Sequence, residues 1–223
     1  MMRNIEISQG EYYHIYNRGV LKQAIFHNIR DWSRFLFLIT YLQSPIAFAN
    51  PNRIITNFVE HRVFNINSKI EATVIKERYV ELVCFCLMPN HFHLIVKEIK
   101  PNGISRYMQR VLNGYSKYFN TKYKKSGHVF QGPYKAKHVS DNNSLLYLST
   151  YIHKNPTSLR IGKDGLHKYQ WSSYFDYIVK NRWNNLLASG VIDEQFSSPD
   201  EYKEFVGNST AKETVDKIAD LLF

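Results

Sequence analysis

The pattern of apolar and polar positions predicts alternating strands and helices along most of the chain. Two-residue alternation and short apolar runs predict strands at 11–17, 79–87, 91–98 and 128–139. Apolar residues three and four positions apart predict helices at 30–43, 104–121 and 142–154. Asn155 stands before Pro156, and a residue before proline is pushed away from helical geometry, so we expect the last of these helices to end there.

This order of elements predicts an α+β fold, with an antiparallel sheet and helices packed on one of its faces. Pro89-Asn90 has the chemistry of a hairpin turn between two of the strands. Gly132-Pro133 interrupts the last strand, which is typical of an edge strand or a bulge. Residues 45–76 have weak periodicity, so we interpret them as an insertion with one short helix near 68–76. The tail at 181–223 is expected to be an accessory element that ends in an amphipathic helix.

Composition adds a strong basic bias to this globular pattern. Of the 223 residues 44% are hydrophobic, which suits a folded domain, and the formal net charge is +10 with a pI near 9.5. A field of that sign attracts phosphate, so a polyanionic partner is indicated, although a solvated basic surface would give the same composition.

The two cysteines and the apolar runs exclude several classes of protein. Cys84 and Cys86 fall on the same side of an apolar strand, so we interpret them as small core residues rather than a disulfide framework or a cysteine zinc site. The start of the chain has no apolar signal segment, and no run approaches the ~20 apolar residues that cross a bilayer. We therefore expect a soluble, cytoplasmic protein with no membrane partner.

The basic residues are concentrated in the stretch between Pro101 and Ser140, which contains no Asp or Glu. The stretch contains Arg106, Arg110, Lys117, Lys122, Lys124, Lys125, Lys135 and Lys137. Aromatic side chains are interleaved with them, and this combination suits single-stranded nucleic acid, because cations neutralise phosphates while ring faces stack on bases. The alternative is that half of the aromatic residues belong to the core and the lysines are simply solvated.

The segment LMPNHFHLIVKE, residues 87–98, contains a candidate pair of metal ligands. Strand alternation sends Phe92, Leu94 and Val96 toward the helices, and it sends His91 and His93 to the opposite, open face. Residues i and i+2 of a strand lie ~6.6 Å apart, which lets two imidazoles converge on one ion. Pairs of this spacing are also common as ordinary surface or core histidines, so a metal site needs a third ligand.

The helix that ends at Asn155 contains residues that could complete such a site. Tyr151 and Asn155 are four residues apart and so share a helix face. The Asn155 amide oxygen could bind a cation, and a cation held with His91 and His93 would polarise a phosphate oxygen. A phenol with its ordinary pKa of about 10 is a poor nucleophile until a metal, a base or a cationic setting activates it. Spacing alone does not choose Tyr151 over its rivals Tyr147, Tyr115 and Tyr118.

Taken together, these segments resemble the single-tyrosine HUH transposases, in particular the REP-associated tyrosine transposase branch, which is IS200-like. The matching stretches are YHIYNRG (13–19), MPNHFHLIV (88–96), SGHVFQGPYKA (126–136), YIHKNP (151–156) and WSSY (171–174), and they occur in the family's order. They cover about residues 11–178, which we expect to form the nuclease domain around the 45–76 insertion. Residues 179–223 are then a C-terminal helical accessory segment.

The resemblance implies a ferredoxin-like or RRM-like sheet and a definite chemistry. It implies His91 and His93 as metal ligands with Asn155 as the third, Tyr151 as the nucleophile, and Mg²⁺ or Mn²⁺ as the cofactor. In this chemistry the tyrosine attacks a phosphodiester of single-stranded DNA and leaves a 5′-phosphotyrosine and a free 3′-OH, so rejoining needs no ATP. The implied substrates are hairpin-forming repeats with single-stranded flanks, bound by Arg18 together with the basic residues of the 101–140 stretch.

Two departures from the family pattern concern the DNA rather than the chemistry. Pro133 stands where the family usually has an arginine after F-Q-G, and Thr157-Ser158-Leu159 replaces the frequent V-R-A after N-P. The resemblance is compatible with a monomer or a homodimer, and with a mobile element or a housekeeping nuclease. Two other functions fit the same residues: a non-catalytic nucleic-acid-binding protein of RRM-like shape, and a metal nuclease that uses water.

Overall fold

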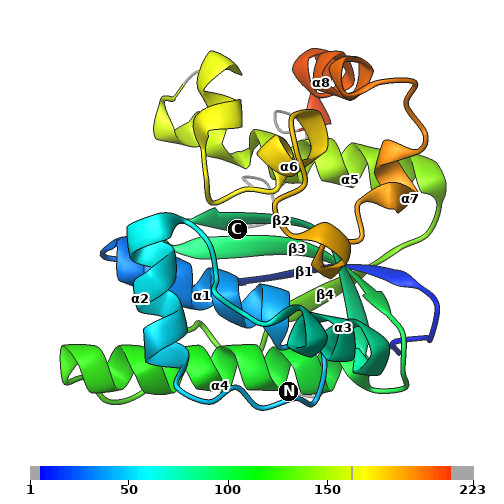
Figure 1. The fold of residues 1–223 in the computed structure, drawn as a ribbon. Coiled ribbons are helices and arrows are strands. Elements are labelled where there is room, and N and C mark those ends of the chain that lie inside the picture. The colour runs from blue at the N-terminus through cyan, green and yellow to red at the C-terminus, as the bar shows by residue number, and fades with distance from the viewer. Residues whose placement is uncertain (1–5, 162, 212–223) are drawn as a thin grey trace.

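A four-stranded antiparallel sheet forms the centre of the fold in a computed structural model that describes residues 6–161 and 163–211 (Figure 1). The strands are β1 (Tyr12–Arg18), β2 (Val80–Met88), β3 (His91–Glu98) and β4 (Lys135–Val139). Their order in the sheet is β2-β3-β1-β4, with one helical connection before β2 and another before β4. This is the order of a ferredoxin-like sheet, and it confirms the predicted α+β fold with β4 at an edge.

Two long helices cover one face of the sheet (Figure 1). They are α1 (Ile29–Tyr41) and α4 (Gly103–Tyr123), and both contact the central strands. Phe35 of α1 meets Phe92 of β3 with 4.9 Å between ring centroids, and Leu94 and Val96 on the same side of β3 are fully buried. The predicted inward direction of the apolar residues of β3 is therefore confirmed.

The opposite face of the sheet, which the sequence pattern led us to expect to be open, is covered by α5 (Asn142–Lys154) (Figure 1). Leu145 and Ile152 form the buried side of α5, and an apolar helix stripe is stable only against another apolar surface. The α-helix ends before Pro156 as predicted, and the chain continues as a 3-10 helix, η2 (Asn155–Leu159).

Most of the later elements lie on the same side as α5 (Figure 1). The later elements are η3 (Lys163–Lys168), α6 (Tyr174–Ile178), η4 (Asn184–Leu186), α7 (Gly190–Asp193) and α8 (Pro199–Asn208). The amphipathic helix expected at the end of the chain falls almost wholly on residues 212–223, outside the described residues. None of the helices among the described residues has the length and apolar character that crossing a membrane would require.

The 45–76 segment contains two helices where one was predicted. The expected short helix is α3 (Ser68–Glu77), and α2 (Pro51–His61) precedes it. Only Ile55 and Phe58 of α2 are buried, which leaves the helix too weak an apolar stripe to be read from sequence. Phe58 stacks on Phe64 with 4.2 Å between ring centroids, so the segment packs around its own aromatic residues.

A buried carboxylate joins the start of α1 to the end of α4. Asp31 is fully buried and accepts hydrogen bonds from the hydroxyls of Tyr118 (2.8 Å) and Tyr123 (2.6 Å) and from Lys122 Nζ (2.5 Å). Burial by itself raises the pKa of this carboxyl, but the hydrogen bonds from Lys122, Tyr123, the His27 backbone and Tyr118 outweigh burial and hold the pKa below its ordinary value. Lys122, a predicted DNA contact, therefore neutralises a charge inside the fold.

We expect Lys122→Met to lower the free energy of unfolding by about 2 to 3 kcal/mol, because it leaves the Asp31 charge buried without its cation. Urea unfolding followed by circular dichroism measures the change. Lys117→Met is the matched control, because Lys117 is exposed on the same helix, and it should change stability by less than about 0.5 kcal/mol. Equal effects of the two substitutions would contradict a structural role for Lys122.

Candidate active site

The alternation of β3 brings both histidines to the sheet face that α5 covers. His93 is buried and His91 is half-buried, and their rings meet nearly at right angles with 5.1 Å between centroids. His93 lies opposite Tyr16 of β1 and Cys86 of β2, and His91 lies opposite Arg18 of β1. Because directly opposed residues of antiparallel strands share a face, the strand register assembles this cluster.

The helix α5 places Tyr151 against the histidines. The Tyr151 ring meets the His93 ring edge-on, with 5.4 Å between centroids and 81° between planes. Tyr151 is only 8% exposed, so it is enclosed by the site rather than standing on the surface. The side chains of His93 and Tyr151 are 58 positions apart in sequence and in contact in space, as the sequence-based hypothesis requires.

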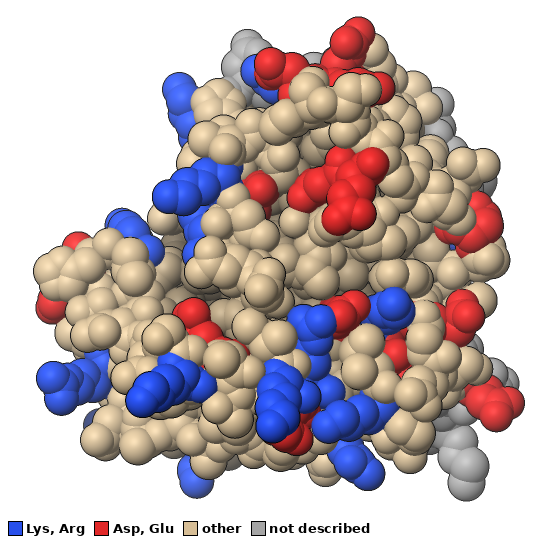
Figure 2. Space-filling model, turned by 45° about the vertical axis from the view of Figure 1, so that its right-hand side comes forward, with Lys and Arg blue, Asp and Glu red and all other residues tan. Residues whose placement is uncertain are grey.

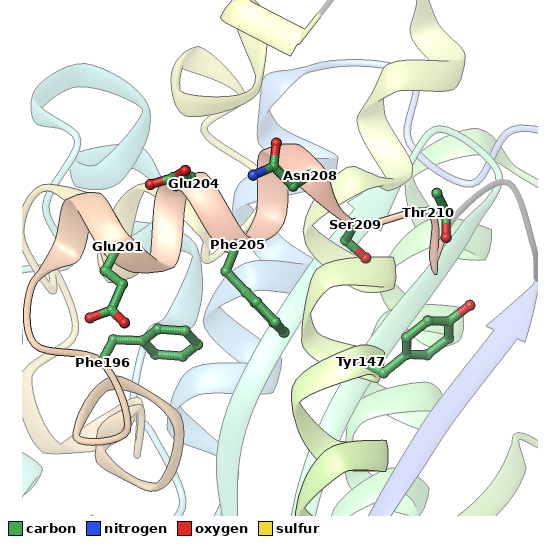
Figure 3. A pocket seen from close by; sticks show the side chains of 8 residues that line it. All are labelled: Tyr147, Phe196, Glu201, Glu204, Phe205, Asn208, Ser209 and Thr210. Carbon is green, nitrogen blue, oxygen red and sulfur yellow. The ribbon is translucent and has the colours of Figure 1, made fainter.

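The rival tyrosines of the sequence analysis lie elsewhere. Tyr115 and Tyr118 are on α4, on the other face of the sheet, where Tyr115 donates to the Ile25 carbonyl and Tyr118 donates to Asp31. Burial raises the pKa of both hydroxyls. Tyr147 is 39% exposed and lines a pocket between α5 and α8 together with Phe205 and other residues (Figure 3).

Two residues of β1 belong to the site and were missed in the sequence. His14 Nε2 lies 2.9 Å from His93 Nδ1, and Tyr16 stacks on His14 with 4.7 Å between ring centroids. Burial, and then the positive charge of Lys137, lower the pKa of His14 to about 3, so its imidazole is neutral at physiological pH. The alternation of residues 11–17 showed that His14 and Tyr16 share a face, but no local signal gave the register between β1 and β3.

Hydrogen bonds from neighbouring residues orient both candidate ligands. His91 Nδ1 lies 2.6 Å from Asn90 Oδ1, which can only accept, so Nδ1 carries the proton and Nε2 is the basic nitrogen. When His93 Nδ1 likewise donates to His14 Nε2, the basic nitrogen of His93 is also Nε2. Metal-binding histidines usually donate their second ring nitrogen in this way, so the donor chemistry fits a metal site.

Asn155 caps α5 one turn beyond the tyrosine. Its side chain is buried, and its Nδ2 donates to the Tyr151 carbonyl at 2.9 Å, which leaves the amide oxygen as the ligand-type atom. Residues 6–161 and 163–211 contain no cluster of three or more His, Cys, Asp or Glu that could hold a metal ion. The candidate ligands are therefore the two imidazoles and the Asn155 amide oxygen, and imidazole suits transition metals better than Mg²⁺.

A buried polar network fixes α5 and with it Tyr151. His153 lies 2.8 Å through Nδ1 from the Tyr202 hydroxyl of α8, and 2.9 Å through Nε2 from Ser173 Oγ. The Cys84 thiol of β2 lies 3.2 Å from the same Nε2. All of these side chains are buried, so α5 is tied to the sheet and to the later helices by hydrogen bonds as well as by packing.

Three of the predicted DNA contacts lie at the edge of the histidine face. Lys135 and Lys137 of β4 are exposed and lie opposite Tyr16 and His14 in the strand register. Lys135 Nζ stands 5.9 Å from the centroid of the Tyr16 ring. Arg18 ends β1 opposite His91 and is exposed. Positive charge therefore borders the candidate site along β4 and the end of β1.

The other predicted DNA contacts are on or just after α4, on the far side of the sheet. Arg110 donates to the carbonyls of Ser44 and Ile46, so this arginine anchors the 45–76 segment. The remaining exposed members are Arg106, Lys117, Lys124 and Lys125. Figure 2 shows a group of basic side chains over the lower part of the view and an acidic patch above it, with charges of both signs scattered elsewhere. The predicted DNA-binding residues thus lie on two faces of the molecule. Two of them, Arg110 and Lys122, bind groups of the protein itself.

Comparison with known proteins gives one family match. The family described as "Transposase IS200 like" matches residues 48–155, which contain His91, His93, Tyr151 and Asn155. Residues 48–155 are therefore similar to IS200-like transposases, in agreement with the resemblance that the motifs carry. A solved structure described as the REP-associated tyrosine transposase bound to a REP hairpin is similar at 12% identity and a TM-score of 0.47, over 89% of this chain and 96% of that chain. No curated protein matches.

We expect stability to fall in acid because His153 is buried as a neutral imidazole. Burial lowers its pKa from 6.5 to about 3, so the unfolded chain binds a proton below pH 6.5 that the folded chain takes up only near pH 3. The contribution of His153 to the free energy of unfolding is therefore complete above pH 6.5 and is lost as the pH falls toward 3. Between pH 7 and pH 5 the loss should be about 2 kcal/mol for this histidine.

Urea unfolding at several pH values, compared between the native chain and His153→Gln, tests this linkage. The variant is less stable at every pH, but it should lose about 2 kcal/mol less between pH 7 and pH 5, since the titrating group is gone. His138→Gln is the comparison variant, because it removes a histidine that is exposed on β4 and not buried. An unchanged slope in His153→Gln would show that His153 is not buried neutral.

Proposed function

We propose that the protein is a metal-dependent endonuclease and transposase that cleaves and rejoins hairpin-associated single-stranded DNA through a 5′-phosphotyrosine at Tyr151. The observation that carries the proposal is the packing of the Tyr151 ring against His93 at 5.4 Å. The match of residues 48–155 to the IS200-like transposase family supports DNA strand transfer as the reaction class. The binding of a REP hairpin by the similar solved structure motivates a hairpin substrate for this chain.

The proposed step exchanges one phosphate ester for another. The Tyr151 oxygen bonds to the phosphorus while the bond from phosphorus to the 3′ oxygen breaks, and the phenolic proton passes to solvent as the 3′ oxygen takes one up. The product is DNA joined by its 5′ phosphate to Tyr151, with a free 3′-OH on the other fragment of the cleaved strand. The reverse attack by a 3′-OH releases the tyrosine, so the number of ester bonds is conserved and no ATP is needed.

His91, His93 and Asn155 would hold the Mg²⁺ or Mn²⁺ ion. A divalent cation there supplies Lewis-acid polarisation of a phosphate oxygen. Asn90 and His14 would orient the two histidine ligands. Asn90 bonds to Nδ1 of His91, and His14 bonds to Nδ1 of His93. Tyr16 is the second tyrosine at the histidines, but burial raises its pKa, and its ring already lies between His14 and Lys135.

The basic edge of the site would hold the DNA strand. Arg18, Lys135 and Lys137 border the histidine face and would neutralise the phosphates on either side of the scissile bond. Arg106, Lys117, Lys124 and Lys125 are proposed as contacts for DNA that extends past the sheet. Arg110 and Lys122 are proposed as weaker contributors, since both already bind groups of the protein.

A covalent adduct with DNA is the direct test. Incubating the protein with hairpin-bearing single-stranded DNA and Mn²⁺ should give an adduct that survives a denaturing gel, and Tyr151→Phe should abolish it because the nucleophilic oxygen is gone. Tyr16→Phe and Tyr147→Phe are matched controls, one at the histidines and one a turn away on α5, and both should retain the adduct.

Each other outcome of this assay indicates a different function or a different nucleophile. An adduct that persists in Tyr151→Phe but disappears in Tyr16→Phe would move the nucleophile to β1. Cleavage without any adduct would favour a nuclease that uses water. Binding without cleavage in the presence of every divalent ion tested would favour a non-catalytic nucleic-acid-binding protein.

Metal binding by the histidine pair is expected independently of cleavage. Titration calorimetry with Mn²⁺ should show His91→Ala and His93→Ala each losing more than about tenfold in affinity, and Asn90→Ala losing about tenfold because His91 loses its orienting acceptor. His138→Ala should bind as the native chain does, since His138 is exposed on β4 and pairs with Glu11. Equal affinity in all variants would place the ion elsewhere.

A further inference from the structure

Leu21 is unusual both in the exposure of its side chain and in the conformation of its backbone. Its side chain is 81% exposed, more than any other large apolar side chain among the described residues. Its backbone is left-handed, with φ 52° and ψ 27°, and Lys22 follows with φ 60°. Residues other than glycine, asparagine and aspartate rarely adopt this conformation, and strain of this kind concentrates where a surface serves a function.

The loop that presents Leu21 is held firmly on both sides. Val20 N donates to the Val129 carbonyl at 3.0 Å, and Gly19 N donates to the Asn90 carbonyl at 2.8 Å. A Cβ on Gly19 would stand 2.3 Å from the Gln23 carbonyl oxygen, so only glycine allows the chain to turn this tightly. Leu21 is therefore a fixed apolar projection and not the tip of a loose loop.

One side chain connects this loop to the candidate metal site. The Asn90 amide donates through Nδ2 to the Lys22 carbonyl at 3.0 Å and accepts through Oδ1 from His91 Nδ1 at 2.6 Å. Arg18, which immediately precedes Gly19, lies opposite His91 in the strand register. The strained leucine thus stands in the loop that follows β1 at the His91 end of the sheet, and the exposed residues Arg18 and Lys22 flank it in sequence.

We propose that Leu21 is an apolar wedge that contacts the end of a base-paired stem where single-stranded DNA enters the histidine site. The proposal rests on the proposed function and adds the residue that recognises the junction. Base faces are apolar and the phosphates around them are anionic, so an exposed apolar side chain in a loop that also carries two exposed cations matches the end of a stem. The side chain has no ring with which to stack along a flexible strand, so it serves the stem end and not the strand.

Leu21→Gly separates this role from stability, because glycine relieves the left-handed backbone and should keep or raise the melting temperature. The probe is a DNA hairpin with a single-stranded 5′ flank and 2-aminopurine at the junction. We expect Leu21→Gly to bind the hairpin about tenfold more weakly and to lose the fluorescence increase that the native chain causes. Affinity for the flank strand alone should not change.

Two further variants control the experiment. Leu21→Asn keeps a residue that tolerates the left-handed backbone but makes the tip polar, so it should behave as Leu21→Gly does. Val179→Ala truncates another exposed apolar side chain, 60% exposed and just beyond α6, and should bind the hairpin as the native chain does. Hairpin affinity that is unchanged in Leu21→Gly, or a native chain that does not prefer the hairpin to the strand, would overturn the proposal.

The failure of this inference can be told from the failure of the proposed function. A Tyr151 adduct that still forms on the unpaired strand in Leu21→Gly, with weakened hairpin binding, supports the wedge beside an intact nuclease. If the native chain forms no adduct but its hairpin binding depends on Leu21, the wedge is supported and the proposed chemistry is contradicted. If the native chain forms the adduct but hairpin binding is the same with and without the Leu21 side chain, only the wedge is contradicted.

Discussion

The pairing of β1 with β3 is the contact on which both faces of this protein depend. It sets Ile15 opposite Leu94 on the side of α1 and α4, and Tyr16 opposite His93 on the side of α5. A shift of one residue would exchange the two faces, since side chains alternate along a strand. The apolar core would then lose its inward residues, and the histidine cluster would lose its neighbours. Stability and the candidate chemistry therefore share one register.

The covering of the second sheet face by α5 turns a surface pair of histidines into an enclosed site. Tyr151 lies against His93, and the same helix is tied down through His153 to the Tyr202 hydroxyl and to Ser173. Buried polar groups are tolerable only when they are hydrogen-bonded, and here each bond also fixes the helix that carries the tyrosine. Burial also lowers the effective dielectric around Tyr151 and His93, which strengthens any charge interaction there.

Local patterns were sufficient wherever periodicity decides structure, and insufficient wherever long-range pairing decides it. The two-residue period of β3 gave the directions of Phe92 and His93, and the helical period placed Tyr151 one turn before Asn155. The role of His14 depends on which strand lies beside β3, which no local spacing encodes. Likewise, the internal partners of Lys122 and Arg110 come from segments far away in sequence, so both residues looked like surface cations.

Figure 2 shows an acidic patch in its upper part and a group of basic side chains in its lower part, so charge is spread unevenly over this face of the molecule. Acidic residues gather on α7 and α8, with Asp193, Glu194, Asp200, Glu201 and Glu204 in or beside these two helices, whereas most exposed members of the predicted DNA-binding set lie along α4 and β4. A polyanion that approaches such a molecule turns it before contact and meets the basic side first. The edge strand β4 is common to the two sides, so the lysines of β4 offer a path around the sheet edge. Encounter rate, more than residence time, is then the quantity that ionic strength controls.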